Sequence, residues 1–174
     1  MRATAFLITT LFTSSALAET RHAEAHVHGV NHAQFILSGS TLQIIYEFPV
    51  AQLNENDEHK HDEHKHDELI GHLKEINSIE AVIAIPIAAK CAQTGINHTL
   101  RAVVSTGVDD ENAGHQDAVI EATLDCQSPS ALNSLDFSPA FGRFNDVEKI
   151  EVEGILGSQS LSETVTAKKA VISF

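Results

Sequence analysis

The fold is decided by residues 33–49, which read AQFILSGSTLQIIYEFP. Apolar side chains alternate with others over 33–37 and again over 42–48, which places them on one face of each of two strands. Ser38-Gly39-Ser40-Thr41 supplies turn residues between these strands, so the pair is predicted to form a hairpin. Pro49 ends the second strand because it has no backbone N–H to donate.

Downstream of the hairpin, the sequence predicts a helix and then a third strand. Acidic Asp67 and Glu68 suit a helix start, and an apolar stripe at helical spacing follows: Leu69, Ile70, Leu73 and Ile76. The apolar run at 79–87, broken only by Glu80 and Pro86, predicts a buried strand.

The second half of the chain repeats this order. Strands are predicted over 97–106, 118–124 and 149–155, and two more near 159–166 and 170–174. Ser128-Pro129 is typical of a helix start and leads into Ala131, Leu132 and Leu135. The sequence therefore predicts an α+β domain with mainly antiparallel sheet and two helices, in two similar strand-strand-helix-strand halves, 32–90 and 97–174.

Residues 1–18 have the pattern of a secretory leader. Arg2 precedes an apolar stretch that ends in Ala16-Leu17-Ala18. We expect cleavage near Ala18, which leaves 19–174 as one exported, soluble domain. No later stretch approaches the roughly 20 apolar residues that a membrane-spanning helix needs.

The chain has two cysteines, Cys91 and Cys126. An even pair in an oxidising compartment predicts a disulfide. It would close a loop of about 36 residues, for which the chain-entropy relation gives about 3.8 kcal/mol of stabilisation. Two free thiols and a pair of thiolate metal ligands are the alternatives.

The charge balance excludes one class of function, and the histidine content suggests another. The chain carries 24 Asp+Glu against 11 Lys+Arg, a net charge of -13, which excludes electrostatic binding of nucleic acid. It also has 11 histidines. Histidine at this density in an acidic exported domain points to divalent metal ions as partners.

The first histidine cluster is the loop at 57–68, where an Asp-Glu-His-Lys-His unit occurs twice and begins a third time. Its candidate ligands are His59, His61, His64 and His66. Neutral imidazoles suit Zn(II), and also Cu(II) and Ni(II). Neither a helix nor a strand gathers all four rings around one ion, so loose, exchangeable binding is predicted. The alternative is a solubilising spacer.

The second cluster precedes the hairpin, at His22, Glu24, His26, His28 and His32. These residues are at even positions, so an extended chain lines them along the face opposite the core. Gly29 allows a bend that returns His32 toward His26 and His28. Imidazoles with a carboxylate match the shell of Zn(II). The alternative is an unstructured N-terminus.

The remaining candidates are His98 and His115. His98 is in phase with apolar Leu100, which favours a partly buried sheet histidine over a metal ligand. His115 lies in the polar segment 109–115, where a metal ligand and a solvated side chain are equally compatible with the sequence.

Catalytic motifs are missing from the sequence. It contains no Gly-x-Ser-x-Gly, His-Glu-x-x-His, phosphate-binding glycine loop or dinucleotide fingerprint. A zinc-dependent hydrolase, with Glu24 or an acid of 109–111 as base, is therefore a weaker hypothesis than metal binding without catalysis. A structural module whose histidines only solubilise it is the third hypothesis.

Several segments together resemble the ZrgA-like family of bacterial zinc-regulated periplasmic proteins. They are the leader, 26–29 (HVHG), 47–49 (EFP), 88–91 (AAKC), the segment from Cys126 to Leu132, and 141–150. The resemblance implies a His-rich periplasmic protein that holds or delivers Zn(II) for an uptake transporter. The HVHG motif and both cysteines match the family pattern. Family members often carry a longer His/Asp-rich insertion between the cysteines, whereas here that segment is short and keeps only His115.

Overall fold

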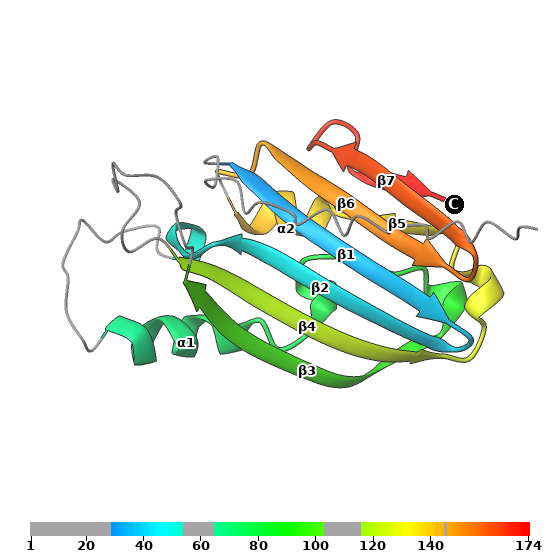
Figure 1. Cartoon of the computed structure of the whole chain (residues 1–174), viewed down its shortest axis with the longest axis horizontal. Helices are drawn as coiled ribbons and strands as arrows, with labels where there is room; N and C mark the ends of the chain where they lie inside the picture. The colour runs from blue at the N-terminus through cyan, green and yellow to red at the C-terminus, as the bar shows by residue number, and fades with distance from the viewer. Residues whose placement is uncertain (1–28, 54–64, 103–115, 145) are drawn as a thin grey trace, which may run out of the picture.

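A six-stranded sheet forms the body of the protein in the computed structural model, which describes residues 29–53, 65–102, 116–144 and 146–174 (Figure 1). The strand order is β3-β4-β2-β1-β6-β7. The strands are β1 (Val30–Ser38), β2 (Thr41–Pro49), β3 (Cys91–Ala102), β4 (Gln116–Cys126), β6 (Lys149–Leu156) and β7 (Gln159–Val165). The predicted hairpin is confirmed as β1 and β2, with Gly39 in the turn at φ 61°.

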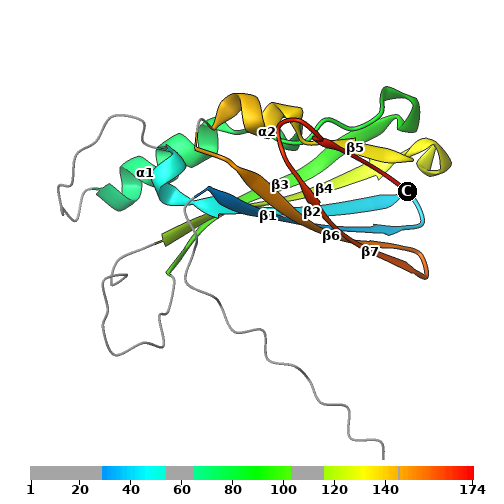
Figure 2. The ribbon, with the colours of Figure 1, turned by 90° about the horizontal axis from the view of Figure 1, so that it is seen from above.

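Two helices and a two-stranded sheet cover one face of the large sheet (Figure 2). The helices are α1 (Lys65–Glu75) and α2 (Ser138–Arg143), and the small sheet pairs β5 (Ser134–Asp136) with β8 (Val171–Ser173). No described element covers the other face of the large sheet. That outer face carries the side chains that alternate with the core positions.

The pairing confirms an α+β fold with mainly antiparallel sheet and two helices. The exception is the β1–β6 pair, which is parallel and was not predicted. It places Phe35 opposite Gly154, where a Cβ atom would collide with the Phe35 ring. Glycine is therefore required at this position for the ring to lie across β6.

The core lies between the sheet and its covering layer. Alternate residues of the strands supply one side of it, among them Phe35, Ile44 and Ile120. The predicted apolar stripe of α1 supplies part of the other side through Leu69 and Leu73. Alternation in the strands and helical spacing in α1 thus predicted the buried positions correctly.

Two predicted elements are wrong. The run at 79–87 forms the 3₁₀ turns η2 (Ile79–Ala81) and η3 (Ile87–Ala89), with only an isolated bridge from Ala84 to Asp136. Ser78 favours the first turn because its Oγ accepts a hydrogen bond from Glu80 N at 3.3 Å. The buried residues of this run, Ile79, Val82, Ile83 and Ile85, belong to a segment of turns packed in the core.

The helix predicted after Ser128-Pro129 is a single 3₁₀ turn, η4 (Pro129–Ala131). The chain then enters β5, because Leu135 pairs with Ile172. The second helix begins instead at Ser138. The predicted two-halves duplication is not confirmed, because the strand expected at 79–87 to complete the first half is not formed.

The predicted disulfide joins Cys91 and Cys126, which are paired residues of β3 and β4. It ties the start of β3 to the end of β4 and packs Cys126 in the core. None of the described helices is long and apolar enough to cross a membrane.

Candidate functional site

The candidate site is the end of the sheet that we call the Val30 end. It is defined by the start of β1 at Val30, the end of β2 at Pro49, the end of β3 at Ala102 and the start of β4 at Gln116. Strand register places these residues together, because Pro49 pairs with Asp117 and Ala102 with Gln116. Val30 pairs with Lys149, so β6 also starts here.

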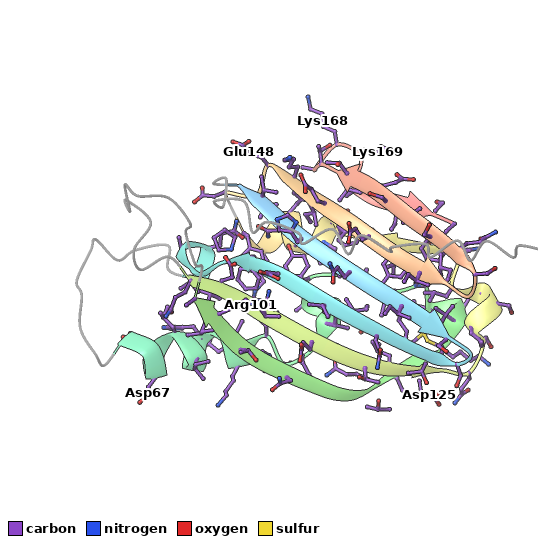
Figure 3. All side chains as sticks on the ribbon, viewed as in Figure 1. Asp67, Arg101, Asp125, Glu148, Lys168 and Lys169 are labelled. Carbon is purple, nitrogen blue, oxygen red and sulfur yellow. A yellow bond between two sulfur atoms is a disulfide. The ribbon has the colours of Figure 1, made fainter. Side chains whose placement is uncertain are left out.

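The His-bearing segments of the sequence all join the described chain at this end. His28 directly precedes Gly29, and His115 directly precedes Gln116. The His-rich loop begins after η1 (Val50–Leu53), which follows β2, and leads into α1. Helix α1 packs against both η1 and β3. Figure 3 labels Asp67 and Glu148 on this side of the molecule and Asp125 at the opposite end of the sheet.

Most predicted ligands lie outside the described residues: His22, Glu24, His26, His28, His59, His61, His64 and His115. His66 belongs to the first turn of α1, and its side chain is also outside the described part. His32 is the one predicted ligand whose side chain is described. Among the described residues, no three His, Cys, Asp or Glu side chains come together as a metal site.

His32 lies on β1 and faces away from the core, as predicted. Its side chain is 43% exposed, and its Nδ1 lies 3.7 Å from Oε2 of Glu151 on the neighbouring strand. Lys149 Nζ donates a hydrogen bond of 2.7 Å to the other oxygen of Glu151. This bond lowers the pKa of Glu151, and the nearby His32 contributes to the same shift. The carboxylate of Glu151 therefore stays ionised beside the ring.

A second polar group occupies the outer face on β2, β3 and β4. Arg101 Nη1 donates to Oε2 of Glu47 at 2.9 Å, and Glu47 is hydrogen-bonded to Asp117. The pKa of the Asp117 carboxyl group is raised to about 7, first by burial and then by the hydrogen bond to Glu47 and the charge of Glu47, while the charge of Arg101 opposes this shift. The two carboxyl groups hold a proton between them at mildly acidic pH.

A buried polar network fixes the segment that leads into the His-rich loop. Asn31, which is fully buried, donates from Nδ2 to Tyr46 Oη at 2.8 Å and to Gln52 Oε1 at 3.1 Å. Gln52 returns a bond from Nε2 to Asn31 Oδ1 at 2.9 Å. Burial raises the pKa of Tyr46, so its hydroxyl stays protonated. The network holds η1 against the start of β1.

A pocket of about 370 Å³ opens beside this network. It lies between η1 and the residues that precede β6, and is lined by Gly29, Gln52, Asp146 and Glu148 among others. Sequence reasoning missed Asn31, Gln52 and both acids, because nothing in their local spacing signals that η1 and 146–148 meet.

Two further histidines contact neighbouring protein groups in the described part of the chain. His98 is partly buried in β3, as predicted, and its Nε2 donates to the carbonyl of Ile76 at 2.9 Å. His72, which the sequence reasoning did not single out, lies on α1 with Nδ1 3.6 Å from Glu75 and Nε2 3.9 Å from Glu68. Glutamates four residues before it and three residues after it were the sequence signal that could have identified this histidine.

Comparison with known proteins gives the family. The model of the family described as "ZrgA family zinc uptake protein" matches residues 25–174. A comparison with curated proteins finds no match. The family match covers every described residue and begins just before the HVHG motif. The chain therefore belongs to the ZrgA family of zinc uptake proteins.

Proposed function

We propose that this protein is exported to the periplasm, binds Zn(II) there, and buffers or delivers the ion to a component of a zinc uptake transporter. The observation that carries the proposal is that the described residues next to the His-bearing segments lie together at the Val30 end of the sheet, in a chain of a zinc uptake family. Imidazole and carboxylate groups supplied from several segments suit a shell that loads and releases an ion.

The proposed ligands form two groups with different tasks. The N-terminal residues His22, Glu24, His26, His28 and His32 belong to a site next to the rigid sheet. The loop residues His59, His61, His64 and His66 capture ions loosely and exchange them, and His115 joins from the third segment. Cu(II) and Ni(II) suit the same side chains, so selectivity for zinc in the cell depends on supply.

The disulfide supports the proposed compartment. A cross-strand disulfide persists in an oxidising environment and is rare in the cytosol. The leader at 1–18 and cleavage near Ala18 remain predictions of the sequence. Sequencing the N-terminus of the protein recovered from the periplasmic fraction tests both: a chain that still begins at Met1 and stays in the cytosol would contradict them.

Metal binding itself is tested by titration calorimetry with Zn(II) on the purified protein. Binding should be measurable at pH 7.5 and weaken strongly at pH 5.5, because imidazole coordinates as the neutral base and its pKa is near 6.5. Replacing His26 and His28 with Ser should remove the tightest site, whereas replacing the four loop histidines with Ser should lower the number of ions bound.

The matched control is His72→Ser, which removes an exposed histidine outside both groups. It should leave the affinity and the number of ions unchanged. Absence of Zn(II) binding by the parent protein at pH 7.5 would end the proposal.

A further inference from the structure

The large sheet has two edge strands, which differ in how well they are protected against pairing with another chain. Among the described strands, β7 lies at one edge and β3 at the other (Figure 1). An edge strand leaves alternate backbone N–H and C=O groups without a strand partner, so proteins shield edges by short length, inward-pointing charges, prolines or bulges. The edge that lacks these features is the one to which a further strand can add.

Strand β7 carries two of the protective features. It is short, with 7 residues. Glu163 lies opposite the core residue Val152 of β6, so its side chain points to the inner face of the sheet, where it pairs with Lys169 at 3.5 Å. A strand added at this edge would cover a charged pair with its own inner side chains. Because burial of charge is costly, β7 disfavours pairing.

Strand β3 is longer, with 12 residues, and its second half is unprotected. Its bulge lies near the start, between Gln93 and Gly95. Gln93 also binds the segment beside it, donating to the carbonyl of Asn77 at 3.1 Å and accepting from Ile79 N at 3.0 Å. From 96 to 102 the pairing with β4 is regular, and these described residues include no proline and no inward-facing Asp, Glu, Lys or Arg. We call 96–102 the β3 edge.

The β3 edge also minimises charge repulsion between two copies of this acidic protein. The chain has 24 Asp+Glu and a net charge of -13, yet β3 contains no Asp or Glu, and Arg101 is its one basic residue apart from histidine. Repulsion between like charges grows as they approach. A strand without carboxylates therefore allows a second copy to come closer than an acidic strand does.

Antiparallel pairing of two β3 edges about a two-fold axis at Thr99 places compatible side chains opposite one another. In this register Thr99 faces Thr99 of the second copy, and Asn97 faces Arg101 of the second copy. All three side chains are exposed. Polar cross-strand pairs of this kind stabilise antiparallel strands, and no like charges lie opposite one another. The two-fold arrangement uses the same surface on both copies, as is usual in dimers.

Arg101 adds a charge-complementary contact in this register. Within one copy its Nη1 reaches across β4 to Glu47 on β2, to which it donates at 2.9 Å. In the pair, Arg101 of the second copy lies opposite Asn97, whose neighbour on β4 is Glu121. Asn97 Nδ2 donates to this carboxylate at 3.3 Å. Glu121 is thus one strand beyond Asn97, the same separation that Arg101 already spans to reach Glu47.

We propose that two copies of this chain associate through the β3 edge and join their six-stranded sheets into one continuous sheet. The contacts are backbone hydrogen bonds along 96–102 and the side-chain pairs around Thr99. Because the two strands run antiparallel, the Val30 ends of the two copies point in opposite directions. The association involves no metal, so it is independent of the proposed zinc binding.

The test is sedimentation of the purified protein over a range of concentrations, with a chelator present so that zinc cannot bridge two copies. The parent should form a dimer. Thr99→Lys should weaken the dimer on the order of 10–100-fold, because it places two lysines opposite each other at the two-fold axis. The matched control is Thr164→Lys, at an exposed position of the other edge strand. It should change the dimer affinity by less than about 3-fold, because distant exposed charges are screened.

A charge swap separates loss of pairing from loss of folding. Thr99→Glu alone should weaken the dimer as Thr99→Lys does. An equal mixture of the two variants should associate again, because a lysine then faces a glutamate. In the parent, amide hydrogen exchange within 96–102 should be slower at concentrations that favour the dimer than after dilution, while exchange in β7 should not change.

Three results would overturn the proposal. The first is a parent that stays monomeric at every concentration, or that dimerises only when Zn(II) is added. The second is an equal loss of association in Thr99→Lys and Thr164→Lys. The third is a mixture of the Thr99→Lys and Thr99→Glu variants that remains monomeric. None of these results bears on whether the protein binds zinc.

Discussion

The backbone N–H of Glu148 donates a hydrogen bond of 2.8 Å to the carbonyl of Gly29. Glu148 is the residue before β6, and Gly29 is the residue before β1. This contact begins the one parallel strand pair of the sheet, in which Val30 lies opposite Lys149. It also fixes the point at which the N-terminal segment leaves the sheet. The same contact therefore sets the strand register and holds Gly29, the last residue of the HVHG motif, at the start of β1.

Substitution of Gly29 by alanine should destabilise the protein by about 2–4 kcal/mol, from the left-handed backbone and the collision with Glu148 together. Gly39→Ala is the control, because Gly39 also has positive φ but a Cβ atom there has nothing within 4 Å. It should cost about 1–2 kcal/mol. Urea unfolding measures both, and equal losses would show that the contact with Glu148 is unimportant.

Loss of the disulfide should lower stability by about 2–5 kcal/mol. The variant Cys91→Ser, Cys126→Ser removes the covalent link between β3 and β4. Chemical unfolding of parent and variant, each with and without reductant, measures the effect. Reductant should destabilise the parent and leave the variant unchanged. A parent insensitive to reductant even when unfolded would contradict the assignment.

Replacement of Asn31 by leucine should cost about 2–4 kcal/mol, since it breaks one buried and two partly buried hydrogen bonds and leaves the Tyr46 hydroxyl without this partner. Adding Tyr46→Phe to this variant should recover about 1 kcal/mol, because it removes the hydroxyl as well. Gln34→Leu, at an exposed position of the same strand, should stay within about 0.5 kcal/mol of the parent. An Asn31→Leu protein as stable as the parent would show that the network contributes nothing.

Asp117 should make stability fall as pH rises from about 4 to about 7. Its folded pKa is about 7, above the ordinary 3.8, so the folded state binds the proton more tightly than the unfolded chain does. The contribution is complete below the unfolded pKa and is lost through the folded one, at up to about 1.4 kcal/mol per pH unit. Asp117→Asn should lack this slope in urea unfolding of metal-free protein at pH 5, 6, 7 and 8. Identical pH profiles for parent and variant would contradict the assignment.

The sequence predicted the elements that depend on local pattern. Alternation over 33–37 and 42–48 gave the hairpin, and helical spacing from Leu69 to Ile76 gave α1. Two cysteines in a chain with a predicted secretory leader led to the prediction of the disulfide. In each case the physical cause lies within a few residues or in the compartment, so it is visible in one sequence.

The predictions failed where distant contacts decide the structure. The parallel pairing of β1 with β6 depends on Phe35 packing over Gly154, which no local pattern encodes. Residues 79–87 form an almost continuous apolar run, and such a run does not distinguish a strand from turns packed in the core. The two acids that line the pocket were missed for the same reason, because Asp146 and Glu148 lie beside Gly29 only in the folded protein.

The most direct measurement of the central claim is a Zn(II) titration of isotopically labelled protein followed by amide NMR. Our account predicts that the amide signals of Val30, Gln52 and Glu148 shift or broaden as zinc is added at pH 7.5, while those of Asp125 and Cys126, at the opposite end of the sheet, stay unchanged. Saturating zinc that leaves the Val30 end unperturbed, or that perturbs the disulfide end instead, would contradict it.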